Sequence, residues 1–224
     1  MQRKTIITGD GSHSIAIPAL RVSYHSIHGA IQESQHVFID AGLKYVLDQP
    51  SKEQISILEV GLGTGLNALL TAIEMEKLET TAYYVALEPF PLTAEEAAAL
   101  NYCHQLKRDD LQEDFNRLHE SGWNKALAFT ENLIVRKLNS PLQEFNDRTK
   151  FDLIFYDAFA PAAQPELWTT PIFEKLFHLL KTGGAVVTYC SKGDVRRAMI
   201  AAGFTVKKLP GPPGKREMLR ATKS

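Results

Sequence analysis

The feature that most constrains this 224-residue chain is a glycine-spaced turn that follows an apolar strand at residues 57–67. The segment reads ILEVGLGTGLN, with glycines at alternate positions and Glu59 two places before the first of them. Such glycines let the backbone approach a ligand that a side chain would keep away. Apolar residues at helical spacing over 67–77 predict a helix that opens at the turn, with its free amide groups facing the ligand. The segment therefore predicts a nucleoside-binding site.

The spacing of the glycines indicates which nucleoside is bound. A dinucleotide-binding turn has its third glycine three places after the second, whereas Leu66 occupies that place here and the glycine is Gly65. The observed pattern, E-x-G-x-G-x-G, resembles motif I of S-adenosylmethionine (SAM) methyltransferases. A tight strand-to-helix turn without a ligand and an NAD-type turn are the alternatives.

A second acidic residue supports a nucleoside site. The apolar run at 82–87 predicts another strand, and Glu88 follows it directly. In open α/β sheets, an acidic residue about 20 positions beyond the glycine turn accepts hydrogen bonds from ribose hydroxyls. We therefore predict that Glu88 binds the ribose, with a solvated carboxylate at a strand end as the alternative.

The composition is that of an ordinary soluble protein, with 44% apolar and 23% charged residues. The chain has no apolar stretch long enough for a membrane span and no leader-like segment, so we expect a cytoplasmic protein without membrane partners. The two cysteines, Cys103 and Cys190, and the seven histidines have no metal-ligand spacing, and no metal is expected. No obligate protein partner is evident.

The net charge of −1 conceals an uneven distribution along the chain. Residues 181–224 contain ten Lys or Arg and two acidic residues, whereas residues 1–180 contain 15 and 24. A basic segment favours a polyanionic partner, because each cation that neutralises a phosphate releases counterions. A solvated basic face is the alternative. The candidates for binding a nucleic acid are Arg196, Arg197, Lys207, Lys208, Lys215 and Arg216.

Alternating strand and helix patterns follow residue 55 and predict a mostly parallel sheet with helices on both faces. We expect seven strands near residues 55–60, 82–88, 132–138, 151–157, 184–190, 203–209 and 216–221. Helices are expected near 64–77, 93–100, 109–121, 170–181 and 192–202. The last two strands are separated by little more than the five-residue segment PGPPG at 210–214, which is too short for a crossover helix, so the final strand should pair antiparallel. This α/β arrangement resembles the Rossmann-like sheet of class I SAM-dependent methyltransferases, which is therefore the expected fold.

The first 50 residues form a predicted extension. Residues 5–17 read as a β-hairpin around an Asp-Gly turn, and a helical stretch runs from Gly29 to about Leu47. We therefore expect a hairpin and lid-like extension over 1–50 and a methyltransferase domain over 51–224. Residues 101–126 have a less definite pattern and are expected to form an inserted helical lobe over one end of the sheet.

The loop after the fourth core strand carries the predicted chemistry. The buried-type strand 151–156 runs into a loop that contains Asp157, Phe159, two prolines and Trp168. Ligands in such sheets lie beyond the carboxyl ends of the strands, so this loop should flank the methyl group of SAM. Asp157 can hold an attacking amine and accept or relay its proton, and Phe159 or Trp168 can stabilise the developing cation. A merely structural proline-rich connection is the alternative.

Several strings together resemble the standalone MnmD-type tRNA methyltransferases, which are similar to the methyltransferase half of the bifunctional MnmC enzymes. The glycine motif is shared by many methyltransferases, whereas the last two of the following strings are more discriminating. The strings are DGS at 10–12, YHSIHGA at 24–30, EVGLGTGLN at 59–67, EPFPL at 88–92, DAFAP at 157–161 with Pro165 and Trp168, and GKREM at 214–218.

The resemblance implies transfer of a methyl group from SAM to the exocyclic amine of 5-aminomethyl-(2-thio)uridine at the wobble position in the tRNA anticodon loop. The implied reacting residues are Asp157 and Phe159, with Trp168, Arg196, Arg197, Lys215 and Arg216 binding the tRNA. The implied SAM-binding residues are Glu59, Gly61, Gly63, Gly65, Asn67, Glu88 and Asp157, with Tyr24, Ser26, Gly29 and Glu33 in a lid over the donor.

Two departures from the family pattern matter. The family often has a Gly-Asp pair that contacts adenine after the third nucleotide-site strand, whereas this chain has Val135 to Asn139 there. The oxidase domain of the bifunctional enzymes is absent, so no FAD is expected. Two other functions stay open: a methyl- or aminopropyltransferase that acts on a small-molecule amine, and a SAM-binding RNA module without catalysis. The basic last fifth of the chain disfavours a polyamine substrate.

Overall fold

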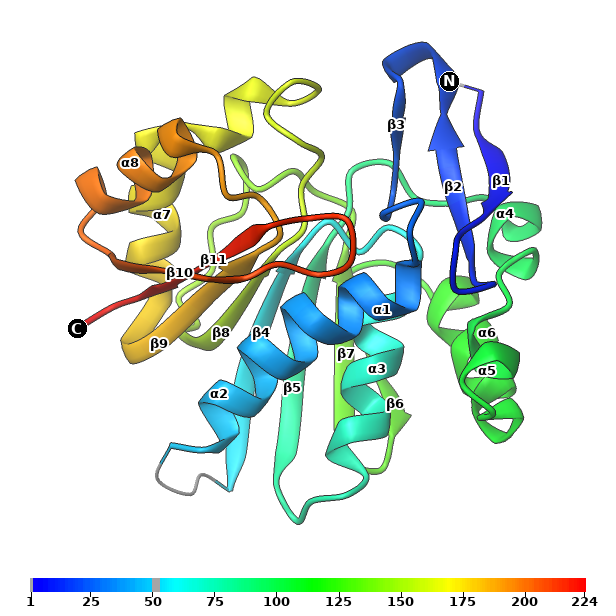
Figure 1. The fold of residues 1–224 in the computed structure, drawn as a ribbon. Coiled ribbons are helices and arrows are strands. Elements are labelled where there is room, and N and C mark those ends of the chain that lie inside the picture. The colour runs from blue at the N-terminus through cyan, green and yellow to red at the C-terminus, as the bar shows by residue number, and fades with distance from the viewer. Residues whose placement is uncertain (1, 50–52) are drawn as a thin grey trace.

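The computed structural model describes residues 2–49 and 53–224, and these form a central sheet of eight strands in the order β10-β11-β9-β8-β4-β5-β7-β6 (Figure 1). The strands of this sheet are β4 (Gln54–Val60), β5 (Thr81–Leu87), β6 (Ala126–Thr130), β7 (Leu133–Leu138), β8 (Phe151–Tyr156), β9 (Leu180–Thr188), β10 (Thr205–Pro210) and β11 (Glu217–Thr222). The five central strands, β9, β8, β4, β5 and β7, pair in parallel. In the described part of the chain, no helix combines the length and apolar character of a membrane span.

The expected antiparallel last strand is confirmed, because β11 lies between β9 and β10 and is antiparallel to both. The expected number of strands was wrong, because the sheet has eight strands and not seven. The additional strand, β6, pairs antiparallel with β7 through a register shift between Ala128 and Thr130. It escaped prediction because its residues alternate only weakly and no glycine or proline marks the turn that joins it to β7.

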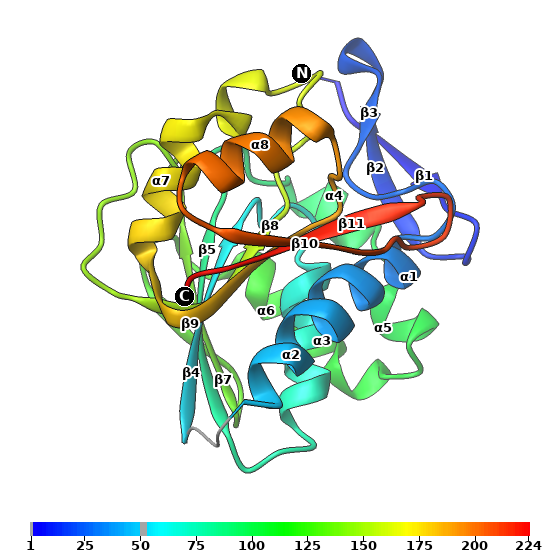
Figure 2. The same cartoon turned by 60° about the vertical axis from the view of Figure 1, so that its left-hand side comes forward.

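Helices cover both faces of the sheet, as the two views in Figures 1 and 2 show. One face carries α1 (Ala30–Ser34), η2 (Gln35–Leu43), α2 (Lys44–Leu47) and α3 (Leu66–Met75), and the other carries α7 (Thr170–Leu179) and α8 (Gly193–Ala201). Alternation along β4 explains the two layers, because Ile57 packs in the core with α3 and its neighbour Leu58 packs in the core with α7.

The segment between β5 and β6 contains α4 (Ala94–Ala98), α5 (Tyr102–Gln105), η3 (Asp109–Leu111) and α6 (Gln112–Glu120). The α4 helix begins with a capping box in which Thr93 accepts a hydrogen bond from the Glu96 amide and Glu96 accepts one from the Thr93 amide. The expected helical lobe is present, and α6 packs against α4 and β6 at one edge of the sheet. Helix α7 ends at Leu179 because β9 begins at the next residue.

The N-terminal segment forms a separate three-stranded antiparallel sheet of β1 (Lys4–Ile7), β2 (His13–Ile17) and the short β3 (Val22–Ser23), with a 3-10 turn, η1 (Pro18–Leu20), between β2 and β3. The predicted hairpin is therefore confirmed, with β3 in addition. Its turn caps the following helix, because Asp10 accepts a hydrogen bond from the Gln32 amide and Thr8 accepts one from Ala30. The predicted boundary between residues 50 and 51 lies outside the described residues.

Candidate active site

A cavity of about 780 Å³ lies at the carboxyl ends of β4, β5 and β8. Its floor is formed by residues 60–64 of the glycine turn, one wall by residues 87–91 and another by residues 157–159. The N-terminal sheet covers it with Ile17, Leu20 and Tyr24. A cavity of this size at the ends of parallel strands is where an open α/β fold holds its ligand.

The glycine turn has the backbone geometry that its sequence predicts. Gly61, Gly63 and Gly65 have φ angles of 94°, 52° and 75°, a region that side chains disfavour. A Cβ atom at Gly63 would lie 2.8 Å from Cδ1 of Tyr24, so turn and ring together shape a slot that a side chain would fill. Gly61 and Gly63 line the cavity, whereas Gly65 lies outside it and precedes α3.

Glu88 faces the cavity from the end of β5 and is almost fully buried. Its two oxygens accept hydrogen bonds from the backbone amides of Gly63, at 2.9 Å, and Phe90, at 2.8 Å. Burial raises the pKa of the Glu88 carboxyl, against the lowering by these two amides and by the charge of Arg3. The carboxylate is thereby fixed in orientation, and its remaining lone pairs can accept from a pair of hydroxyls.

Asp157 follows β8 and faces the same cavity, half-buried. Its carboxyl accepts a hydrogen bond of 3.0 Å from the side-chain amide of Asn67, and the same amide donates to Glu59 at 2.8 Å. Burial raises the pKa of Asp157 to about 8, and the charge of Glu33 adds to this effect. The hydrogen bond from Asn67 and the charge of Lys215 oppose the rise.

Glu59 and Asn67, both predicted to bind the donor, are buried and do not line the cavity. Glu59 lies within β4, where burial raises its pKa well above the usual value. Because Asn67 links Glu59 to Asp157, these two side chains support the orientation of Asp157 from behind.

The loop after β8 is stiffened by side chains that bind its carbonyl groups. The Trp168 indole donates to the Phe159 carbonyl at 2.8 Å, and the Tyr189 hydroxyl donates to the Ala158 carbonyl at 2.8 Å. The ring of Phe159 lines the cavity and meets Tyr24 edge to face, with centroids 5.1 Å apart. Trp168 is 6% exposed and lies outside the cavity, in the core formed with α7, so the structure places it where it holds Phe159.

Ser26, Glu33 and Lys215 form a cluster beside the cavity and do not line it. The Ser26 amide donates to Glu33 at 2.6 Å, and Glu33 forms an ion pair with Lys215. The Lys215 ammonium also lies 3.9 Å from the centroid of the Tyr189 ring. Lys215, predicted to bind RNA, is thus already held by a buried carboxylate and an aromatic face.

The remaining basic candidates are distributed along one edge of the sheet. Arg196 and Arg197 lie on α8, which begins just beyond the carboxyl end of β9, and Arg197 forms an ion pair with Asp194. Arg216 is exposed in the turn between β10 and β11. The structure therefore brings the last fifth of the chain to the cavity edge of the sheet without placing these cations inside the cavity.

Sequence reasoning missed two parts of the cavity lining. Arg3 reaches the cavity from the residue before β1, and no motif surrounds it. Pro141 and Leu142 line it from the loop after β7, where strand order alone would have placed a ligand wall. The Gly-Asp pair that the family pattern would place there is absent. In its place the Leu138 carbonyl accepts from the Glu88 amide at 3.0 Å, and the Asn139 side chain donates to the Glu88 carbonyl at 3.0 Å.

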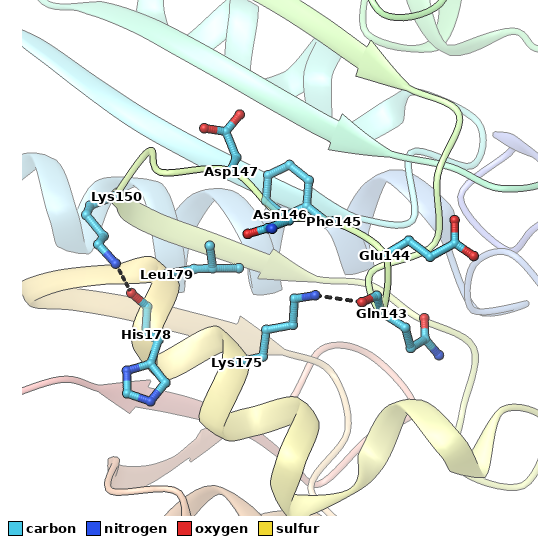
Figure 3. A pocket seen from close by; sticks show the side chains of 9 residues that line it. All are labelled: Gln143, Glu144, Phe145, Asn146, Asp147, Lys150, Lys175, His178 and Leu179. Atoms are coloured by element: carbon cyan, nitrogen blue, oxygen red, sulfur yellow. Dashed lines mark hydrogen bonds between the residues drawn. The ribbon is translucent and has the colours of Figure 1, made fainter.

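A second hollow of about 510 Å³ lies behind that loop, against α7, and Figure 3 shows its lining. Two lysines cross it, with Lys150 donating to the His178 carbonyl at 2.6 Å and Lys175 to the Gln143 carbonyl at 2.8 Å. Both ammonium groups therefore bind backbone carbonyls, and Lys175 ties the loop that forms a wall of the main cavity to α7. Within residues 2–49 and 53–224, no cluster of three or more His, Cys, Asp or Glu side chains could hold a metal ion.

The parallel sheet with one antiparallel strand inserted near its edge, the glycine turn and the acidic residue after β5 define a class I SAM-dependent methyltransferase fold. The main cavity fits such a donor, since it offers a side-chain-free turn and a fixed carboxylate. Residues 104–224 match the family model described as S-adenosyl-L-methionine-dependent methyltransferase, and the chain belongs to this family. SAM is accordingly its methyl donor.

Two curated relatives are each named tRNA 5-methylaminomethyl-2-thiouridine biosynthesis bifunctional protein MnmC. The protein of Nitrosospira multiformis is 33% identical over 207 residues, covering 88% of this chain and 33% of its own length. That of Ectopseudomonas mendocina is 33% identical over 211 residues, covering 88% and 31%. The chain therefore spans about a third of the length of the curated relatives that it matches.

Solved structures support the same fold. MnmC2 from Aquifex aeolicus superposes with a TM-score of 0.80 at 24% identity, covering 100% of this chain and 70% of that one. SAM-bound CalS10 from Micromonospora echinaspora, an amino pentose methyltransferase, superposes with a TM-score of 0.53 at 13% identity, covering 88% and 92%.

Proposed function

We propose that this chain methylates the exocyclic amine of 5-aminomethyl-(2-thio)uridine at the wobble position of tRNA, giving the 5-methylaminomethyl form. The observation that carries the proposal is Asp157, a carboxyl that faces the donor cavity beside Phe159. The names of the MnmC relatives support the substrate, and the proposed partner is the tRNA anticodon loop. A tRNA substrate also supports action in the cytoplasm.

SAM, when bound, supplies an electrophilic methyl group on a positively charged sulfur. Asp157 accepts a hydrogen bond from the attacking amine and takes up the proton that its ammonium form must lose. Without ligands the raised pKa keeps this carboxyl mostly protonated near neutral pH, and the positive charges of the bound sulfonium and the ammonium would favour the ionised form that accepts the proton. Once this proton has passed on to solvent, the carboxylate favours the positive charge that moves onto the nitrogen as the nitrogen–carbon bond forms and the sulfur–carbon bond breaks.

Phe159 and Tyr24 supply the remainder of the proposed reaction chamber. Their rings meet edge to face at the cavity wall, so one ring face can stabilise a cationic amine. Trp168 and Tyr189 hold the Phe159 and Ala158 carbonyls and thereby stiffen the loop that presents Asp157 to the cavity. We propose that Glu88 binds the ribose of the donor and that Gly61 and Gly63 let the backbone lie against its other half.

We further propose that the first 50 residues act as the lid-like extension and that residues 51–224 form the catalytic domain. Tyr24 and Leu20 line the cavity from above, which supports a covering role for the N-terminal sheet. The helix from Ala30 to Leu47 packs against α3 and β9, which fastens this extension to the central sheet.

The proposed RNA surface consists of exposed cations. Arg197 and Lys208 also form exposed ion pairs, with Asp194 and Glu217, and such pairs are weak enough for phosphates to displace. Arg216 and Arg197 are exposed at the cavity edge, as are Lys207 and Lys208 on β10. Lys215 is a poorer candidate for direct RNA contact, because moving it would leave the buried Glu33 without its cation.

The proposal is tested by incubating the purified protein with labelled SAM and tRNA that carries 5-aminomethyl-2-thiouridine, followed by mass spectrometry of the nucleosides. We expect the label in 5-methylaminomethyl-2-thiouridine and a loss of turnover of about 10²–10⁴-fold in Asp157→Ala with donor affinity nearly intact. Binding of SAM without label in this nucleoside would refute the substrate. Label in a free amine would indicate the small-molecule alternative.

A further inference from the structure

We propose that Arg3 is a positioning residue that fastens the N-terminal sheet over the nucleoside half of the donor site and thereby slows release of the spent donor, S-adenosylhomocysteine. The inference rests on the proposed roles of Glu88 and Tyr24 in the donor site and is independent of the methyl acceptor. It concerns the residue immediately before β1, which no motif of the sequence marks.

The Arg3 guanidinium bridges to a segment almost 90 residues away. One terminal nitrogen donates to the Pro91 carbonyl at 2.9 Å and to the Glu96 carboxylate at 3.0 Å, and the other donates to the Phe90 carbonyl at 2.6 Å. The side chains of the ion pair are only 13% and 22% exposed. A planar guanidinium suits this pattern, because it reaches two carbonyls and a carboxylate at once, which an ammonium cannot match in geometry.

The segment that Arg3 holds is the segment that orients the proposed ribose ligand. The Phe90 amide donates to Glu88, and the Phe90 carbonyl accepts from Arg3. The backbone of Phe90 therefore connects the side chains of Glu88 and Arg3. Glu96 also caps α4 through the Thr93 amide, which fixes the acidic partner of Arg3. A shift of Arg3 would therefore be transmitted to the position of Phe90 and the orientation of the Glu88 carboxylate.

Arg3 also approaches the cover of the cavity. Its guanidinium carbon lies 5.9 Å from the centroid of the Tyr24 ring, and that ring packs over Gly63. Arg3, Tyr24 and Glu96 all line the cavity. One side chain thus connects the N-terminal sheet, the wall after β5 and the ring above the glycine turn.

The far end of the N-terminal sheet has a fastening of its own. The His13 amide donates to the Asn101 side chain at 2.8 Å, and Asn101 donates to the Gly11 carbonyl at 3.0 Å. With the hairpin turn held there, loss of Arg3 should free the cavity end of the sheet without detaching the hairpin. This predicts a local change in donor release and preserves the fold.

The test compares Arg3→Ala and Arg3→Lys with the wild-type protein. The matched control is Lys4→Ala, which removes the exposed cation that follows Arg3 at the start of β1. The probes are S-adenosylhomocysteine and methylthioadenosine, which retains the nucleoside half and lacks the amino acid. Binding is measured by calorimetry, and release is measured by chasing labelled S-adenosylhomocysteine with unlabelled compound. Melting temperature and circular dichroism report whether each variant is folded.

We expect Arg3→Ala to release S-adenosylhomocysteine at least tenfold faster and to bind methylthioadenosine more weakly by a similar factor. Lys4→Ala should release it at the wild-type rate. Arg3→Lys should give an intermediate release rate, because it retains the charge and loses the planar geometry. Release from folded Arg3→Ala within twofold of wild type would overturn the proposal, and so would weakening of S-adenosylhomocysteine without weakening of methylthioadenosine.

A second readout separates this role from general loosening. The charge of Arg3 lowers the pKa of Glu88. Two other titratable groups also interact with the Glu88 carboxyl, Tyr24 of the N-terminal segment and Glu59 of β4. S-adenosylhomocysteine affinity should fall at acidic pH as Glu88 becomes protonated. Arg3→Ala should therefore move this fall to higher pH, and Arg3→Lys should return it to the wild-type position. An unchanged pH dependence of affinity in Arg3→Ala would count against the proposal.

Wild-type protein that binds S-adenosylhomocysteine and fails to methylate tRNA would refute only the proposed acceptor.

Discussion

Replacement of Asp157 by Asn should stabilise the folded protein while abolishing most of its turnover. The carboxyl is half-buried, faces the cavity and has a pKa that burial raises from 3.8 to about 8. Because the pKa is higher in the folded chain, the protonated form is favoured there, and the associated stability is complete below the unfolded pKa. It is lost progressively as the pH rises from about 4 to about 8.

The magnitude follows from the pKa values in the two states. At pH 7 the unfolded carboxyl is ionised, whereas the folded carboxyl is mostly protonated. Because pH 7 lies about three units above the unfolded pKa, the difference corresponds to about 4 kcal/mol at most. Solvent in the cavity screens a half-buried group, so we expect about 2 kcal/mol of added unfolding free energy in the variant. Asn has the shape of the neutral acid and can still accept the hydrogen bond from Asn67.

The assay is urea unfolding of the wild type and Asp157→Asn at pH 5, 7 and 8, with donor absent. The stability gain of the variant should increase with pH over this range and level off above it. Asp194→Asn is the control, because Asp194 is exposed on α8 and its replacement should give a small difference without this trend. A gain that is equal at pH 5 and pH 8, or a variant less stable than wild type at pH 8, would show that Asp157 is not held in its neutral form.

Three other substitutions probe the donor and RNA sites. Glu88→Gln should weaken S-adenosylhomocysteine binding about tenfold or more in calorimetry, because an amide accepts from two ribose hydroxyls less well than a carboxylate, and unchanged affinity would remove Glu88 from the donor site. Gly63→Ala should lower the free energy of unfolding by about 1–2 kcal/mol and weaken donor binding, since the added Cβ would lie 2.8 Å from Tyr24. Wild-type stability together with wild-type donor affinity would contradict the slot geometry. Arg216→Glu should weaken tRNA binding and reduce the slope of log affinity against log salt by about one or more, and an unaltered slope would place the RNA elsewhere.

The fold was largely predictable because its determinants are local. Alternating apolar patterns and short turns specified seven of the eight strands of the main sheet, and the six-residue turn before β11 specified its antiparallel pairing. The missed strand, β6, has little periodicity of its own and is stabilised by pairing with β7 and packing against α6. Its existence therefore depends on neighbours that the local sequence does not describe.

Within the site, residues at strand ends were predictable, and residues behind them were not. Glu88 and Asp157 face one cavity because the carboxyl ends of parallel strands meet at one edge of a sheet. The strand pattern did not reveal that Glu59 accepts a hydrogen bond from Asn67 away from the cavity. It also did not reveal that Trp168 is buried against α7 and donates to the Phe159 carbonyl. Which face a side chain occupies depends on what packs there.

The sequence by itself therefore determined the order of strands and helices, the glycine turn and the two acidic positions that follow β5 and β8. Only the tertiary structure decided which distant segments complete the cavity, as in the contact of Arg3 with residues 90–96 and the pairing of Lys215 with Glu33. The physical reason is range. Backbone conformation and apolar periodicity are encoded within about ten neighbouring residues, whereas these ion pairs form only after the chain has brought separate elements together.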